Sequence, residues 1–180
     1  MTRTLRAATL LALGLGAVTA VGTAIATAGA QSMPTATAAI QDPSGKALGT
    51  VTLTQYPHAV LVKGELSGLA PGPHGLHIHQ NGACTPDFAA AGGHFNPAGA
   101  QHGLDAEPHH TGDLANIVAD AQGNARFEQI THHVTLGEGA NSLFKDGGTA
   151  IVVHAGPDDY TSEPAGASGD RVGCGVIRKG

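Results

Sequence analysis

Aromatic and basic residues are scarce in this sequence. Aromatic side chains make up 3% of the 180 residues, tryptophan is absent, and 9 Lys and Arg stand against 14 Asp and Glu, for a net charge of −5. The chain contains no basic stripe or Lys/Arg cluster, which argues against nucleic acid as a partner. Its length suits one ordinary domain.

The helical period is also missing, since no long stretch beyond residue 30 repeats its apolar residues every three to four positions. Short segments alternate instead between apolar and polar residues and are rich in Val, Ile and Thr, with turn signals between them. This pattern predicts an all-β sandwich or barrel of about eight strands. The segments are 35–41, 47–56, 58–69, 74–80, 114–123, 124–136, 149–155 and 174–180.

Two stretches, residues 81–112 and 156–173, are too long for simple turns. Long loops without secondary structure in a compact domain are usually functional or disordered. The first stretch holds Cys84 and several histidines, which favours a loop folded around metal.

The first 30 residues resemble a secretory signal peptide. Arg3 and Arg6 precede an uncharged run, and Ala28 and Ala30 form a small-residue cleavage pattern. We expect cleavage near Ala30, a flexible lead-in over 31–36 and a folded domain over 37–180. The alternative is an uncleaved membrane anchor, because the run is long enough to span. We expect export to the periplasm, cell envelope or extracellular space, with no stable membrane partner once the leader is cleaved.

Cysteine is nearly absent, with only Cys84 and Cys174 present. In an oxidising compartment a lone pair of cysteines favours a disulfide, which here would close most of the mature domain into one loop. The alternative is two free thiols.

Histidine, in contrast, is abundant, with 11 in the chain. His77 and His79 lie two apart in an alternating segment, so in a strand both imidazoles face one side and Ile78 faces the other. His154 ends the apolar strand "TAIVVHA" and could complete with them an all-nitrogen site of the kind that suits copper. The alternatives without a metal are that His77 and His79 form an exposed polar face and that His154 is a strand-end histidine with a satisfied hydrogen bond.

The first long loop carries a second set of candidate ligands. Three imidazoles and a carboxylate make a tetrahedral zinc set, and a metal could order a loop that has little core of its own. The alternative is a solvated, histidine-rich loop with no ligand. The candidates are His94, His102, His109, His110 and Asp113.

Five segments together resemble the signatures of copper/zinc superoxide dismutase, in particular its bacterial, exported members. They are "HGLHIHQNGAC", "GGHFNP", "HHTGDLAN", "VVHAGPDDY" and "GDRVGCGVI", and they occur in the family's order. The resemblance as a whole extends over nearly all of residues 36–178. The resemblance implies an eight-stranded Greek-key β-barrel or sandwich, immunoglobulin-like, with two long functional loops.

The resemblance also implies a role for each site residue. The copper ligands would be His77, His79, His94 and His154, and the zinc ligands would be His94, His102, His110 and Asp113, so that His94 bridges the two ions. His109 adjoins His110 and stays the alternative zinc ligand. Arg171 would lie over the copper and meet the anion, Asp158 would link a copper histidine to a zinc histidine, and Cys84 would pair with Cys174. His74 would be structural, and His58, His132 and His133 would be surface or strand residues.

The implied activity is dismutation of superoxide to dioxygen and hydrogen peroxide, by alternate reduction and reoxidation of a copper ion beside a structural zinc. Arg171 would attract the substrate anion. Lys145 is a candidate for a second positive charge that attracts it, because the loop before Arg171 is otherwise acidic. The resemblance allows a homodimer as well as a monomer. Two rival hypotheses are a copper-handling protein on the same fold and a zinc hydrolase.

Overall fold

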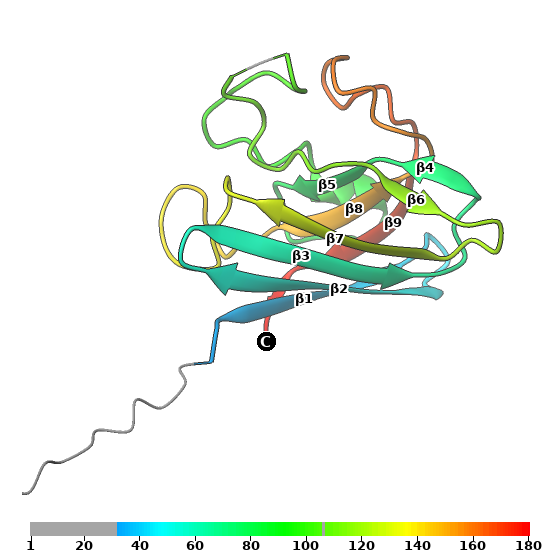
Figure 1. The fold of residues 1–180 in the computed structure, drawn as a ribbon, viewed down its shortest axis with the longest axis horizontal. Coiled ribbons are helices and arrows are strands. Elements are labelled where there is room, and N and C mark those ends of the chain that lie inside the picture. The colour runs from blue at the N-terminus through cyan, green and yellow to red at the C-terminus, as the bar shows by residue number, and fades with distance from the viewer. Residues whose placement is uncertain (1–31, 106) are drawn as a thin grey trace, which may run out of the picture. The chain divides into compact units, whose positions relative to one another are not determined.

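The computed structural model describes residues 32–105 and 107–180. In this part of the chain the elements are strands, apart from one short 3₁₀ helix, η1 (Phe88–Ala91), so the predicted all-β class is confirmed (Figure 1). The strands are β1 (Thr35–Gln41), β2 (Ala47–Tyr56), β3 (Ala59–Leu66), β4 (Gly72–His74), β5 (Leu76–His79), β6 (Ile117–Ala119), β7 (Ala125–Thr131), β8 (Ala150–His154), β9 (Arg171–Val176) and β10 (Arg178–Lys179).

The main sheet is antiparallel and runs in the order β5-β8-β9-β1-β2-β3-β7, with β10 paired to β1. After the β1-β2-β3 meander the chain crosses to the far edge, where β5 pairs with β8. Such a crossover is the Greek-key type of connection. The separate ribbon β4-β6 lies beside β7 and continues into β5 through Gly75, so the sheet curls into a barrel (Figure 1).

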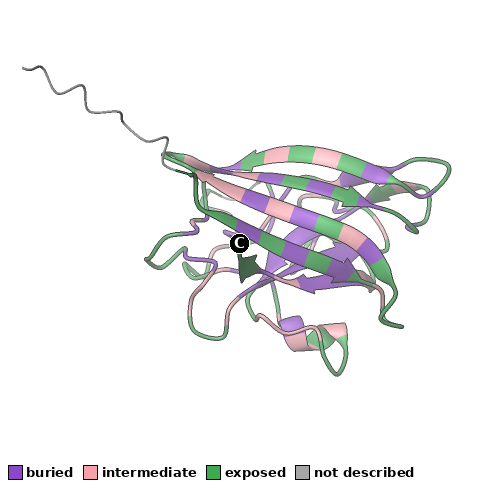
Figure 2. Ribbon diagram, turned by 90° about the horizontal axis from the view of Figure 1, so that it is seen from below, coloured by how far each residue is buried: buried purple, intermediate pink, exposed green. Residues whose placement is uncertain are grey.

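The barrel core is built from alternate residues of each strand. In β1 every second side chain is buried, and β3 repeats the pattern, which gives the striped ribbons of Figure 2. A period of two places one face of a strand against the core and the other against solvent. The main cluster includes Ile40, Leu53, Val62, Ile78 and Ile151, all fully buried.

Strands β5 and β8 differ because all of their residues are buried. Ile78 and Ile151 belong to the main core, whereas Ala150 and Val152 belong to a second apolar cluster with Ala91 of η1. The outer face of these strands is therefore covered by the first long loop. Side chains on this outer face are shielded from water without being part of the barrel core.

A disulfide fixes this loop to the sheet, as predicted. Cys84 in the loop is bonded to Cys174 of β9, with 5.9 Å between their Cα atoms. Cys174 belongs to the second apolar cluster, and Cys84 packs against it. The bond therefore holds the loop against the outer face of β8 and β9.

Two predicted segments, 35–41 and 47–56, coincide with β1 and β2. The sequence missed β4 because its residues fall in the apparent turn "APGPHG", and pairing with β6 makes them a strand. The second long loop was predicted to end at Gly173, but β9 already begins at Arg171, where it pairs with His154. The predicted leader lies outside the described residues, among which no helix is long and apolar enough to cross a membrane.

We predict that the Cys84→Ala/Cys174→Ala double variant is less stable than the natural chain by about 4–5 kcal/mol. The bond joins residues 90 positions apart, and closing so long a loop removes that much entropy from the unfolded chain in the simplest model. Urea unfolding of the metal-free proteins, with and without dithiothreitol, measures the difference. The reductant should lower the midpoint of the natural chain and leave the double variant unchanged. An equal midpoint for both proteins would contradict the prediction.

Candidate metal centre

Two groups of side chains with metal-binding atoms meet at the outer face of β5 and β8. In each group the ligand atoms lie within 4.8 Å of one another, and His94 belongs to both. The four-histidine group is His77, His79, His94 and His154, and the mixed group is His94, His102, His110 and Asp113.

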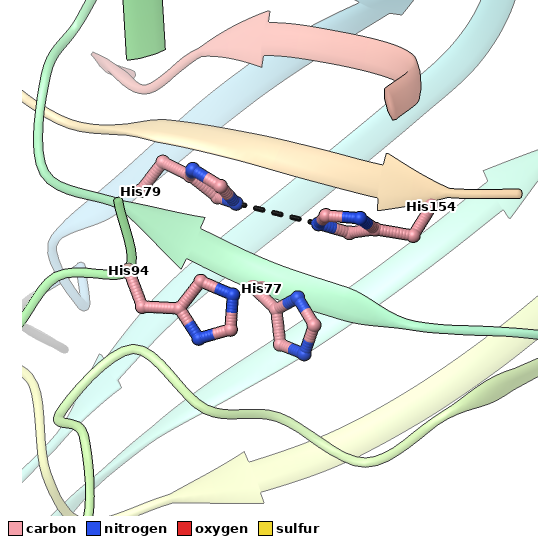
Figure 3. Close-up of side chains that lie close together, drawn as sticks. All are labelled: His77, His79, His94 and His154. Atoms are coloured by element: carbon pink, nitrogen blue, oxygen red, sulfur yellow. Dashed lines mark hydrogen bonds between the residues drawn. The ribbon is translucent and has the colours of Figure 1, made fainter. Parts of the chain in front are cut away.

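The strands position the four-histidine group. His77 and His79 both leave the outer face of β5, as the period of two predicts, and His154 lies at the end of the neighbouring β8 (Figure 3). His94 comes from the loop, and a β-bridge pairs its backbone with that of His79. The rings of His77 and His94 lie 3.9 Å apart between their centres.

Each strand histidine of this group has one ring nitrogen fixed by a hydrogen bond to an outer acceptor. Carbonyl and carboxylate oxygens accept, so the bonded nitrogen carries the hydrogen and the other nitrogen keeps its lone pair. The nitrogens left with lone pairs face one another, and Nε2 of His79 lies 3.5 Å from Nε2 of His154 (Figure 3). The bonds run from His77 Nε2 to Asp158 Oδ2 (2.7 Å), from His79 Nδ1 to Gly92 O (2.9 Å) and from His154 Nδ1 to Gly169 O (3.1 Å).

His94 faces both groups with its two nitrogens. Its Nδ1 lies 2.7 Å from Asp113 Oδ1 and 3.4 Å from Nδ1 of His110. Its Nε2 is buried and has no hydrogen-bond partner among the described residues. The ring is thus shared, with Nδ1 on the side of the mixed group and Nε2 available to the four-histidine group.

The mixed group surrounds the carboxylate of Asp113. His102 Nδ1 lies 3.0 Å from Asp113 Oδ2, and His110 Nδ1 lies 3.5 Å from Asp113 Oδ1. Although close to Asp113, His102 Nδ1 forms no hydrogen bond of acceptable geometry, so it is also a buried atom without a partner within residues 32–105 and 107–180. Three nitrogens and one oxygen are the donors of a tetrahedral zinc site.

Three buried ring nitrogens therefore have no hydrogen-bond partner in the described residues: His77 Nδ1, His94 Nε2 and His102 Nδ1. Leaving a buried polar atom unpaired costs about 1–3 kcal/mol, so such atoms are rare in folded proteins. All three belong to the two ligand groups. Metal ions fit these positions because coordination would satisfy the lone pairs, and the all-nitrogen group suits copper.

Asp158 connects the two groups from outside. Its Oδ2 accepts from His77 and its Oδ1 accepts from Nε2 of His102 at 3.0 Å. Both bonds engage the nitrogen opposite the one that faces the group, so a single carboxylate fixes the orientation of two rings.

Sequence reasoning missed the residues that hold Asp158. The Asn116 side chain donates to the backbone carbonyl of Asp158 and accepts from the backbone N–H of Asp158, both at 2.8 Å. The backbone N–H of Asn116 in turn donates to the Tyr160 hydroxyl at 2.8 Å. Gly166 has a φ of +63° and packs so closely on Asp158 that a Cβ would collide with the carboxylate. Asn116 ends the segment "HHTGDLAN", so the motif contained the residue but gave no sign of its contact.

The structure also separates the adjacent candidates His109 and His110. His110 contributes a ligand atom to the mixed group. The ring of His109 lies against that of His133 instead, and its Nδ1 is 3.9 Å from Asp113. His74 is near the centre but has carbonyl oxygens 2.7 Å from both ring nitrogens, which leaves no nitrogen for a metal.

Arg171 is held at the edge of the four-histidine group by the loop. Its Nη1 donates to the Phe88 carbonyl and its Nη2 to the Gly92 carbonyl, both at 2.6 Å. The Gly92 carbonyl also accepts from His79, so one backbone group positions both the cation and a candidate ligand. The Cys84–Cys174 bond ties this loop to the strand that carries Arg171.

Burial keeps the strand imidazoles neutral. It lowers the pKa of His77 to about 4, of His154 to about 4 and of His79 to about 2. Burial alone would also lower the pKa of His102, but the hydrogen bond to Asp158 and the charge of Asp113 outweigh it and raise that pKa. Metal ions bind the neutral ring, so His77, His79 and His154 can bind a metal at neutral pH.

We predict that the metal-free protein loses stability as the pH falls from about 6.5 towards 4. The folded pKa values of His77, His79 and His154 lie below the value of 6.5 for an unfolded chain, so the unfolded state binds more protons in this range and unfolding becomes easier on acidification. The raised pKa of His102 opposes the trend with a single group.

Thermal unfolding of the metal-free protein between pH 7.5 and 4.5 measures this dependence. A His79→Gln variant should show a smaller slope, and His58→Gln, which changes an exposed histidine, should keep the natural slope. A melting temperature that is flat over this range would contradict the prediction.

Comparison with known proteins identifies the family. The sequence model described as "Copper/zinc superoxide dismutase (SODC)" matches residues 47–177. Superoxide dismutase [Cu-Zn] 2 of Aquifex aeolicus is 49% identical over 138 residues, which cover 74% of this chain and 81% of the relative. Superoxide dismutase [Cu-Zn] of Deinococcus radiodurans is 41% identical over an alignment of 193 positions, which covers 99% of this chain and 98% of the relative.

Among solved structures, a double mutant of a superoxide dismutase-like protein from Bacillus subtilis superposes with a TM-score of 0.74 at 33% identity. The match covers 78% of this chain and 95% of that protein. The predicted Greek-key barrel, the copper and zinc cofactors and superoxide as the substrate are thereby confirmed. The chain belongs to the copper/zinc superoxide dismutase family, and it is an enzyme that dismutates superoxide.

Proposed function

We propose that the four-histidine group holds the copper ion, that the mixed group holds the zinc ion and that His94 is the shared ligand. The observation that carries this assignment is the orientation of His94, whose Nδ1 lies 2.7 Å from Asp113 while its buried Nε2 has no hydrogen-bond partner among the described residues. Bound copper supplies one-electron redox chemistry, which oxidises one superoxide to dioxygen and reduces a second to peroxide. Two superoxide ions and two protons thus give dioxygen and hydrogen peroxide.

His94 is the residue we assign to proton delivery. Its Nε2 is a buried nitrogen beside the copper ligands, and its Nδ1 is anchored among the zinc ligands. A ring held by one nitrogen keeps its position while the other nitrogen takes up or gives up a proton. Whenever Nε2 is free of the metal, it can carry a proton and give it to the forming peroxide.

Arg171 is the residue we assign to substrate binding. Two of its N–H groups are fixed by the carbonyls of Phe88 and Gly92, and the guanidinium has further N–H groups for an anion. Burial lowers its pKa, but a guanidinium ordinarily titrates so far above neutrality that the charge persists at neutral pH. A fixed cation beside the copper ligands attracts and orients superoxide.

We propose that the protein acts outside the cytoplasm, in the periplasm, cell envelope or extracellular space. The Cys84–Cys174 disulfide supports this location because such bonds persist in oxidising compartments. The proposal includes a signal peptide over residues 1–30, with the uncleaved anchor as the alternative. Determination of the first residue of the protein recovered from the cell envelope distinguishes the two.

We predict that His94→Ala lowers the superoxide dismutation rate more than about 100-fold. Loss of a group that only orients a metal ligand typically costs 10–100-fold, and His94 is proposed as a ligand to both ions. Pulse-radiolysis rates and the copper and zinc content of the purified protein measure the effect, with His58→Ala as the control for loss of a histidine. An undiminished rate in His94→Ala would show that the ring is not the shared ligand.

We predict that Arg171→Ala lowers the dismutation rate at low ionic strength about tenfold, since electrostatic steering raises association rates by 10–10³. Its copper and zinc content should be unchanged, because Arg171 offers no ligand atom. Arg171→Lys keeps the charge but not the pair of hydrogen bonds, so its rate should lie between those of the other two proteins. Rates measured from low to high salt test this, and Arg171→Ala matching the natural enzyme throughout would refute the assignment.

A further inference from the structure

Of the histidines outside both ligand groups, three line the same cavity. The cavity has a volume of about 580 Å³, and its wall includes His109, His132 and His133 together with His102 and Asp113 of the mixed group. His132 and His133 are exposed, whereas His102 is only 3% exposed. The cavity therefore joins a histidine-lined surface to the proposed zinc ligands.

His109 and His133 are close enough to share an ion. Their ring centres lie 4.7 Å apart. Ring pairs within the four-histidine group span 3.9 to 6.3 Å, so the spacing of this pair falls inside the range of rings that can meet at one metal. The two residues come from different parts of the chain, the first long loop and the turn after β7.

The tautomer of His109 suits a metal ligand. Its Nδ1 lies 2.9 Å from the carbonyl oxygen of His110, which can only accept, so Nδ1 carries the hydrogen and Nε2 keeps its lone pair. A metal-ligating histidine is commonly oriented by such a bond from its other nitrogen. The ring of His133 forms no hydrogen bond with residues 32–105 or 107–180 in the structure, so both of its nitrogens are available.

The charges around His133 also favour a ligand. Partial burial of the otherwise exposed His133 ring and the neighbouring His109 lower its pKa, while the carboxylate of Glu107 acts in the opposite direction. The carboxylate of Glu107 acts on this ring and would offset part of the charge of a bound cation.

We propose that His109 and His133 form a third metal site, which binds a zinc ion from solution and passes it to the mixed group. Imidazole donors suit zinc, and two ligands with open positions make a site weak enough to release the ion. Transfer is short, because His109 directly precedes His110 and lines the same cavity as His102 and Asp113 of the mixed group. The transfer to the mixed group rests on the proposed zinc ligands. Binding of zinc by His109 and His133, here called the surface pair, does not depend on them.

Titration of the copper- and zinc-loaded protein with zinc chloride tests the third site. Isothermal titration calorimetry should find one further zinc ion per natural chain. His133→Gln should weaken that binding at least about tenfold, the lower end of the loss seen when even an outer partner of a metal site is removed. His58→Gln is the matched control, since His58 is exposed and its side chain does not line the cavity.

The rate of zinc uptake by copper-loaded, zinc-free protein tests the transfer. His133→Gln should take up zinc several-fold more slowly than the natural chain and His58→Gln, and should reach the same final zinc content. A further zinc ion bound equally by His133→Gln and His58→Gln overturns the third site, and equal uptake rates overturn the transfer. If the natural protein holds no tightly bound zinc before titration, the proposed zinc ligands have failed, and the titration still decides whether the surface pair binds metal.

Discussion

The ring of His94 has to face two sets of donors at once, and this requirement constrains the chain on both sides of it. One nitrogen meets the carboxylate of Asp113 and the other lies buried beside the strand histidines. The backbone is held by its bridge to His79, so the loop cannot shift without moving the shared ring. Three buried ring nitrogens have no hydrogen-bond partner in the part of the chain that the structure describes, and in a metalloprotein coordination offsets the free-energy cost of leaving them unpaired.

The outer face of the barrel makes such a centre possible. Strands β5 and β8 are covered on one side by the core and on the other by the first long loop. Burial on this second side lowers the pKa of the strand histidines and keeps them ready for metal. The disulfide holds the covering loop in place, and the same loop supplies the carbonyls that fix Arg171. Stability and chemistry thus depend on one set of contacts.

Asp158 and the surface pair His109 and His133 show how the two long loops divide their tasks. Asp158 comes from the second loop and orients one ring in each ligand group. His109 comes from the first loop and lies between the mixed group and solvent, beside the ring of His133. The proposed route for zinc therefore runs through the cavity that these histidines line together with His102 and Asp113 of the mixed group.

The sequence alone determined the fold class, the limits of β1 and β2 and the shared face of His77 and His79, because alternation with a period of two is a local property of the chain. Its motifs also identified the family and the cysteine pair. Only the tertiary structure distinguished His110 from His109, revealed β4 and brought Asn116 to Asp158. These features depend on segments far apart in the chain, such as residues 116 and 158, whose contact no local pattern encodes. Which ring nitrogen of His77, His79 and His154 is held by a hydrogen bond was likewise decided by partners that only folding brings near.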